Sequence, residues 1–146
     1  MTLRIAPLLC LLLLLSACSR DAPQSGAPAA ALPPFDGDGR IGWQGVLACA
    51  DCDGIDTSLA LSRAGEQRDY LLVETYLTQD GGERFVEQGR WRQQGQALIR
   101  LQAIDGGERV YALQADGRLQ PRDGQGRRFA RRDGDFLTPM TASSGL

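Results

Sequence analysis

Residues 70–77, Tyr-Leu-Leu-Val-Glu-Thr-Tyr-Leu, decide the fold class of this chain. Within this stretch Tyr70, Leu72, Glu74 and Tyr76 alternate with the residues between them. A period of two places the two sets on opposite faces of an extended strand, whereas a helix needs apolar residues every three to four positions. The stretch therefore predicts a β-strand.

Similar extended runs lie on both sides of this strand. They fall at residues 41–47, 56–61, 85–91, 97–101, 109–115 and 118–120. Outside the first 18 residues, no stretch sustains the apolar spacing of a helix. Short strands at regular intervals predict an all-β sandwich or barrel.

Aspartate–glycine pairs separate the predicted strands. Eight of the 13 aspartates precede a glycine, and the pairs at 80–81, 105–106 and 116–117 each fall between two extended runs. Both residue types tolerate the positive φ angles that tight hairpins require. We therefore predict a small antiparallel meander, whose closure into a barrel would remove its exposed edges.

The charged residues exclude several classes of chemistry. Sixteen basic and 18 acidic residues give a net charge of −2, so there is no electrostatic reason to expect nucleic acid as a partner. All the basic residues are arginine. Without histidine and lysine there can be no serine–histidine catalysis, imidazole metal ligand, Schiff base or Walker-type phosphate loop. We expect a non-enzymatic protein with no catalytic residues.

The amino terminus resembles a bacterial lipoprotein signal. Arg4 precedes an apolar run at 5–15, which is too short to span a membrane but suits the core of a signal peptide. The sequence Leu-Ser-Ala-Cys follows at 15–18 and resembles a lipobox. We expect residues 1–17 to be removed and Cys18 to be lipidated, as with palmitate, and to become the first mature residue.

Position 19 predicts the membrane that holds the anchor. Lipoproteins of the inner membrane typically carry aspartate after the lipidated cysteine, whereas this chain has Ser19. We expect the acyl chains on Cys18 to anchor the protein in the outer membrane. The folded domain would then face the periplasm, an oxidising compartment.

Three segments follow the signal peptide. Residues 18–39 contain the lipidated cysteine and a stretch rich in proline and alanine, which we interpret as a disordered tether. The extended runs occupy about 40–137, enough chain for one modest core, and the residues from Thr138 onward look frayed. The family resemblance given below extends the β-barrel domain over 40–140 and leaves 141–146 as a flexible tail.

Cys49 and Cys52 are the cysteines left once Cys10 departs with the signal peptide and Cys18 is lipidated. Full extension would put their Cα atoms about 10 Å apart, and a disulfide needs less than about 7 Å. A disulfide therefore requires a turn, which the aspartate–glycine pair at 53–54 supports. In an oxidising compartment we favour a structural disulfide.

Other uses of the cysteine pair make different demands. A thioredoxin-like redox site would need the pair to open a helix, but residues 55–61 predict a strand. Zinc would need four ligands, and two thiolates without histidine cannot supply them. Copper(I) accepts fewer soft ligands, so reduced Cys49 and Cys52 could hold it, although Met140 is the only methionine of the mature chain and offers no thioether cluster.

Residues 45–59, Gly-Val-Leu-Ala-Cys-Ala-Asp-Cys-Asp-Gly-Ile-Asp-Thr-Ser-Leu, resemble the signature of the NlpE lipoproteins. Further similar positions are Glu74, Tyr76, Gly89, Trp91, Leu98, Leu101, Tyr111, Leu119, Asp123, Gly126 and the segment at 137–140. The resemblance covers 41–140, the amino-terminal domain of that family. It implies a small lipocalin-like barrel on an outer-membrane lipoprotein associated with copper resistance and envelope-stress signalling.

This chain departs from the family pattern in two respects. Family members usually have proline before the first cysteine of the pair, and here the residue is Ala48. Larger members carry a second domain with its own disulfide, so we expect any sensing of oxidative folding that depends on that domain to be absent here.

Two glycines and an arginine cluster are further candidates. We expect Gly54, after the cysteine turn, and Gly89, inside an extended run, to be required by the backbone rather than by a ligand. Arginines at 127, 128, 131 and 132 surround Phe129. They could contact lipid phosphates, but such residues more often form a solvated edge that blocks strand aggregation.

Three functional hypotheses follow. The first is a partner-binding module in surface or envelope-stress sensing or in copper tolerance, with an envelope signalling protein as its partner. The second is a lipocalin-like carrier of a small apolar ligand, which would need an interior cavity of a few hundred cubic ångströms. Trp43, Trp91, Tyr76 and Phe85 could line such a cavity, although aromatics in a small domain are more often core. The third is an inhibitor of a periplasmic hydrolase, for which the sequence shows no inhibitory loop.

Overall fold

The computed structural model describes residues 37–140 of the 146-residue chain. The predicted signal peptide (1–17), the lipidated Cys18, most of the predicted tether and the predicted tail (141–146) lie outside these residues. Those assignments therefore stay predictions. Nowhere in 37–140 is there a helix long and apolar enough to cross a membrane.

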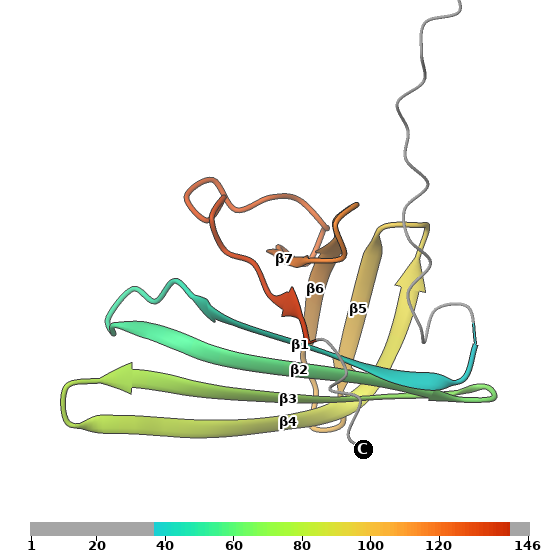
Figure 1. Ribbon diagram of the computed structural model, residues 1–146, viewed down its shortest axis with the longest axis horizontal. Coiled ribbons are helices and arrows are strands. Elements are labelled where there is room, and N and C mark those ends of the chain that lie inside the picture. The colour runs from blue at the N-terminus through green and yellow to red at the C-terminus, as the bar shows by residue number, and fades with distance from the viewer. Residues whose placement is uncertain (1–36, 141–146) are drawn as a thin grey trace, which may run out of the picture.

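Eight antiparallel strands form one sheet (Figure 1). They are β1 (Gly39–Leu47), β2 (Gly54–Ala64), β3 (Gln67–Thr78), β4 (Gly81–Gln94), β5 (Leu98–Ala103), β6 (Glu108–Leu113), β7 (Leu119–Arg122) and β8 (Thr138–Pro139). Their order across the sheet is β7-β6-β5-β4-β3-β2-β1-β8. All seven strands predicted from the sequence are present, and each pairs with the next along the chain.

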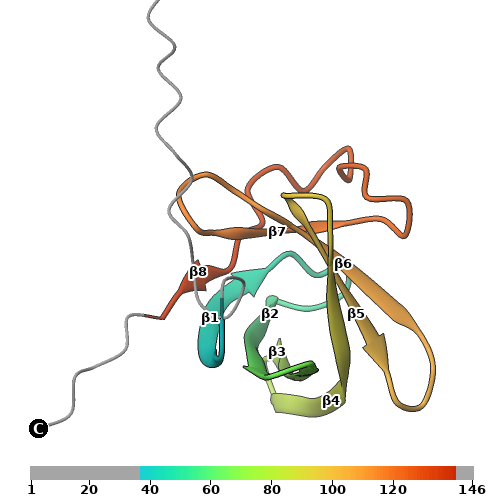
Figure 2. The same ribbon diagram turned by 90° about the vertical axis from the view of Figure 1, so that its right-hand side faces the viewer.

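The sheet curls until its two ends nearly meet (Figure 2). Leu119 of β7 and Leu137, just before β8, form an antiparallel bridge with backbone N–H···O distances of 2.9 and 2.8 Å. We call this bridge the seam. The prediction of an antiparallel meander closing into a barrel is confirmed, because the seam joins the first and last strands of the sheet.

Alternate residues of the central strands fill the barrel. One face of β2 and β3 contributes Leu59, Leu61, Tyr70 and Leu72, each at most 3% exposed. The apolar core as a whole consists of Trp43, Leu47, Leu59, Leu61, Tyr70, Leu72, Trp91, Ile99, Leu101, Tyr111, Leu119 and Leu137. Trp43 Nε1 donates a hydrogen bond to the Gly117 carbonyl oxygen at 2.8 Å, so the indole is buried with its polar atom satisfied.

Glycine alone provides the special backbone geometry of the hairpins. Gly81, Gly106 and Gly117 have φ angles of 120°, 98° and 84°, and no other residue type among those described has a positive φ. The aspartates act differently from our expectation. Asp116, for example, accepts a hydrogen bond from the Arg118 backbone N–H at 3.1 Å and so stabilises the turn through its side chain.

The prediction of a frayed segment beginning at Thr138 is wrong for its first three residues. Thr138 and Pro139 pair with Gln44 and Trp43 as β8, and the Met140 N–H donates to the Gly42 carbonyl at 2.8 Å. Proline is tolerated because β8 is an edge strand. A strand of two residues is too short to produce a periodic pattern, so the sequence did not reveal it.

Candidate functional site

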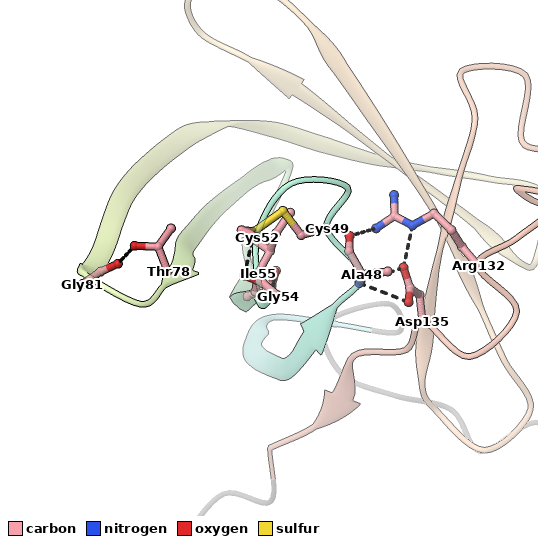
Figure 3. The surroundings of a disulfide bond; sticks show 10 residues. Ala48, Cys49, Cys52, Gly54, Ile55, Thr78, Gly81, Arg132 and Asp135 are labelled. Atoms are coloured by element: carbon pink, nitrogen blue, oxygen red, sulfur yellow. Dashed lines mark hydrogen bonds and ion pairs between the residues drawn. A yellow bond between two sulfur atoms is a disulfide. The ribbon is translucent and has the colours of Figure 1, made fainter.

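The cysteine pair lies in the connection between β1 and β2. Cys49 and Cys52 are joined by a disulfide, with their Cα atoms 5.4 Å apart (Figure 3). The expected turn and disulfide are therefore both present. Cys52 Sγ also lies 3.2 Å from the Gly54 carbonyl oxygen. Because a disulfide sulfur carries no proton, this is a close contact and not a hydrogen bond.

A distant ion pair holds the entrance to this turn. Asp135, only 8% exposed, accepts hydrogen bonds from the Ala48 N–H at 3.2 Å and from Arg132 Nε at 2.5 Å. Arg132 Nη2 in turn donates to the Ala48 carbonyl at 3.2 Å (Figure 3). Both backbone groups of Ala48 are thus bound. The family usually has proline where this chain has Ala48. Proline has no N–H to donate, so only a residue such as alanine can make this hydrogen bond to Asp135.

The cysteine pair as found here is a poor metal site. A disulfide sulfur has no thiolate charge, and metal binding requires the thiolate. Within the described residues no group of three or more histidine, cysteine, aspartate or glutamate side chains is placed to hold a metal ion. After reduction the pair would offer two sulfur ligands, which suits copper(I) better than zinc.

Gly89 sits where β4 changes partners. It pairs with Tyr70 of β3 on one side and with Ala103 of β5 on the other. A Cβ atom there would lie 2.0 Å from the Gln102 carbonyl oxygen and 2.8 Å from Tyr70 Cε1. No Cβ fits in that space, so this position requires glycine for the close approach of β5.

Gly54 begins β2 with a φ of 155°. A Cβ atom there would lie 2.6 Å from Val46 Cγ1, the end of an exposed side chain that can move aside. The steric demand at Gly54 is therefore weaker than at Gly89.

A charged cluster that the sequence did not predict lies beside the apolar core. Arg109 of β6 makes a bidentate pair with Glu74 of β3, at 3.1 and 3.0 Å, and its Nε lies 3.1 Å from a carboxylate oxygen of Glu87 on β4. The Tyr70 hydroxyl donates to Glu87 at 2.9 Å. We call Tyr70, Glu74, Glu87 and Arg109 the charged cluster. Its one sequence signal was Glu74, a charge among inward-facing residues.

The charged cluster changes the acidity of nearby tyrosines. Burial, and then the hydrogen bond to Glu87, raises the pKa of Tyr70 well above its ordinary value of 10.0. Burial is also the largest cause of the raised pKa of Tyr111, with Arg109 acting in the opposite direction. Both phenols are therefore held in the neutral form over the physiological range.

Two clefts open on either side of the charged cluster. The first, of about 250 Å³, is lined by residues that include Leu72, Phe85 and Val86. The second, of about 290 Å³, is lined by residues that include Leu47, Ile55, Arg122, Phe129 and Arg132. The clefts share Glu74, Tyr76 and Arg109 as walls.

The aromatic residues divide between the core and the clefts. Trp43 and Trp91 are at most 3% exposed and belong to the apolar core. Tyr76 and Phe85 form an edge-to-face pair with ring centroids 5.3 Å apart, and both line the first cleft. Trp43 and Trp91 therefore pack the interior of the barrel, and the two clefts lie beside the charged cluster.

The predicted basic cluster disperses into separate roles. Arg127 pairs with Asp123 at 2.9 Å, and Arg132 pairs with Asp135 while lying 5.4 Å from the centre of the Phe129 ring. Arg128 lies opposite Arg122 in an isolated β-bridge. The segment after β7 therefore lies along the edge of that strand at this bridge.

Comparison with known proteins identifies relatives of the domain. A family model described as the NlpE N-terminal domain matches residues 43–131. Lipoprotein NlpE of Escherichia coli strain K12 is 33% identical over 103 residues, which cover 70% of this chain and 40% of the relative. The chain therefore spans about two fifths of that relative's length. No solved structure gives a significant match.

Proposed function

This chain belongs to the NlpE family of lipoproteins, and from that premise we propose a function for it. It is a non-enzymatic lipoprotein, anchored in the outer membrane by acyl chains on Cys18, with its barrel domain facing the periplasm. The domain acts as a partner-binding module in envelope-stress or surface sensing or in copper tolerance. Its partner is an envelope signalling protein.

The observation that supports a binding role is the unpaired edge of β4. Strand β4 pairs with β3 from Gly81 to Arg90, but its register with β5 begins only at Gly89. Among the described residues, no strand pairs with the other side of residues 81–87, and the first backbone bond on that side is from the Ile104 N–H to the Gln88 carbonyl oxygen at 3.0 Å. Such an edge presents backbone donors and acceptors to which a strand of another protein can add.

The side chains on this edge support the same role. Phe85 and Val86 are 47% and 55% exposed, and they point to opposite faces of β4. Large apolar side chains beside an open strand edge favour an added strand, because they offer it contact on both faces. Glu83 and Arg84 lie next to them and would discourage indiscriminate pairing.

Site-specific photo-crosslinking in the envelope tests this proposal. A photoreactive amino acid is placed at position 86 of the full chain, and for comparison at Ala130, which is exposed in the connection between β7 and β8. We expect a discrete crosslinked protein from position 86 only. The proposal fails if both positions yield the same products or if neither yields any.

A functional readout accompanies the crosslinking. Val86→Asp introduces charge on the β4 edge at an exposed position, so the fold should tolerate it. In cells that carry an envelope-stress reporter, we expect overproduction of the wild-type chain and of Ala130→Asp to raise the reporter signal, and overproduction of Val86→Asp not to raise it. An unchanged response in Val86→Asp would exclude this edge as the partner site.

A further inference from the structure

Arg122 is a cation without a counterion in the described part of the chain. Its Nε atom is buried, and no hydrogen-bond acceptor lies within reach of it there. None of the ion pairs among residues 37–140 includes Arg122. A guanidinium that has lost water on one side without gaining a partner is costly, so this side chain is an unsatisfied feature of the fold.

The backbone places a second cation beside Arg122. The turn after β7 brings Arg128 opposite Arg122 in an antiparallel bridge, closed by hydrogen bonds from Asp123 N–H to the Arg127 carbonyl at 3.0 Å and from Gly126 N–H to the Asp123 carbonyl at 2.8 Å. Directly opposite residues of such a bridge point to the same face, and like charges there repel.

The pKa of Arg122 reflects this setting. Burial lowers it most, and the charge of Arg128 lowers it further, while Asp133 acts in the opposite direction. Asp133 is exposed, and among the described residues it forms no ion pair with Arg122. The two arginines therefore keep a net positive charge that Asp133 offsets only in part.

The carboxylates in the wall of the adjacent cleft are already engaged. Glu74 is paired with Arg109, and Glu108 is paired with Arg92 and Arg100. Neither is available to Arg122. Of the positive side chains lining this cleft of about 290 Å³, Arg109 and Arg132 have carboxylate partners and Arg122 has none.

The remaining lining is largely apolar. Leu47, Ile55, Val110 and Phe129 contribute to the cleft. Its volume of about 290 Å³ lies just below the range for small-molecule sites, roughly 300–1,000 Å³, so only a short ligand fits. The cleft thus combines one free cation, an apolar wall and room for a short ligand.

We propose that this cleft binds a small anionic amphiphile, whose oxyanion head group pairs with Arg122 and whose short apolar portion contacts Leu47, Ile55 and Phe129. Carboxylate and phosphate can each accept two parallel hydrogen bonds from the planar guanidinium. Arg128 strengthens the attraction from outside the cleft. This site is separate from the β4 edge, so it neither requires nor supports the partner-binding role proposed above.

Calorimetric titration of the full lipidated chain in a neutral maltoside detergent tests the proposal. The probes are hexyl phosphate, hexanoate, inorganic phosphate and neutral hexan-1-ol. We expect one molecule of hexyl phosphate or hexanoate to bind per chain, and the tighter of the two identifies the head group. Inorganic phosphate lacks the apolar chain and hexan-1-ol lacks the anionic head group, so each should bind at least tenfold more weakly.

Two matched variants assign the binding to Arg122. Arg122→Gln should weaken binding of the tighter amphiphile by at least tenfold, whereas Arg131→Gln, an exposed arginine outside the cleft, should change it less than twofold. Thermal unfolding checks the fold. Arg122→Gln should melt no lower than the wild type, because it removes a repulsion.

Four results would overturn the proposal. They are the absence of amphiphile binding, equal weakening in both variants, hexan-1-ol binding as tightly as the anions, and inorganic phosphate binding as tightly as hexyl phosphate. Because the titration uses purified protein without a partner, its failure leaves the crosslinking result at the β4 edge unaffected.

Discussion

The apolar core and the charged cluster are built from the same strand but depend on different interactions. Leu72 and Glu74 lie two residues apart on the inner face of β3 and are 1% and 5% exposed. Leu72 needs only apolar neighbours of suitable volume. Glu74 needs Arg109 from β6, a strand 34 to 39 residues further along the chain. Two inward-facing positions of the same strand are therefore stabilised differently: Leu72 by apolar packing and Glu74 by a counterion.

Removing the shared cation should have the largest effect. Arg109→Met leaves Glu74 and Glu87 without their counterion, and loss of one partner from a buried pair costs about 3–5 kcal/mol, reduced here because Arg109 is 39% exposed. We expect a loss of about 2–3 kcal/mol in urea unfolding. Adding Glu74→Gln should restore part of it, since the uncompensated charge is then removed.

The control for this prediction is an exposed pair. Arg92→Met breaks a bridge to Glu108 in which Arg92 is 62% exposed, and such pairs contribute about 0–1 kcal/mol. If Arg109→Met destabilised the protein no more than Arg92→Met, the charged cluster would contribute no more to stability than an exposed ion pair.

The position where the two regions meet should tolerate little. Gly89 contacts Tyr70, which belongs to both regions, and a Cβ there would clash with the Gln102 carbonyl. We expect Gly89→Val to cost at least about 2 kcal/mol, because overpacking against backbone forces strands apart. Gly124→Val is the matched control, since no atom lies within 4 Å of its Cβ position. Equal melting temperatures would show that β4 and β5 can separate freely.

The disulfide lies outside both regions, and its loss should affect stability less. Cys49→Ser with Cys52→Ser opens a loop of only four residues, so we expect a loss of about 1–2 kcal/mol from the loop-length dependence. The same variant tests copper. Titration of copper(I) into oxidised and reduced chains should show no binding by the oxidised form. Tight one-to-one binding by the reduced wild type, absent in the double variant, would show that the pair has a role beyond structure.

Raising the pH should lower the free energy of unfolding through the charged cluster, and this effect should be smaller still. Because the pKa of Tyr70 is raised in the folded state above its ordinary 10.0, its stabilising contribution is complete below about pH 10 and falls as the pH rises further. Tyr70→Phe should flatten this decline in the free energy of unfolding and cost about 1 kcal/mol at neutral pH through the lost bond to Glu87. An unaltered slope would mean that Tyr111 alone carries the dependence.

The sequence predicted what depends on local pattern. Alternation in 70–77 indicated β3, and the aspartate–glycine pairs indicated the hairpins that connect the meander. The cysteine turn followed from the short distance that a disulfide allows. Each of these features depends on residues that are close together in the sequence, so a single sequence is enough to predict it.

What the sequence did not predict depends on register between distant segments. Glu74 meets Arg109 only because β3, β4, β5 and β6 lie in order across a curved sheet. Asp135 reaches Ala48 across 87 positions. Arg122 faces Arg128 only once the turn between them has formed. No periodic pattern in the chain encodes these pairings.

The seam has a consequence for motion. Strands β2 and β3 share eleven registered residue pairs, whereas the seam consists of one bridge between Leu119 and Leu137. Local opening requires less free energy where fewer bonds must break. The amide protons of these two leucines should therefore exchange with deuterium well before those of β2 and β3. Each such opening would briefly expose the side chain of Leu137 to water. The barrel would thus open locally at the seam while the pairing of its other strands stays intact.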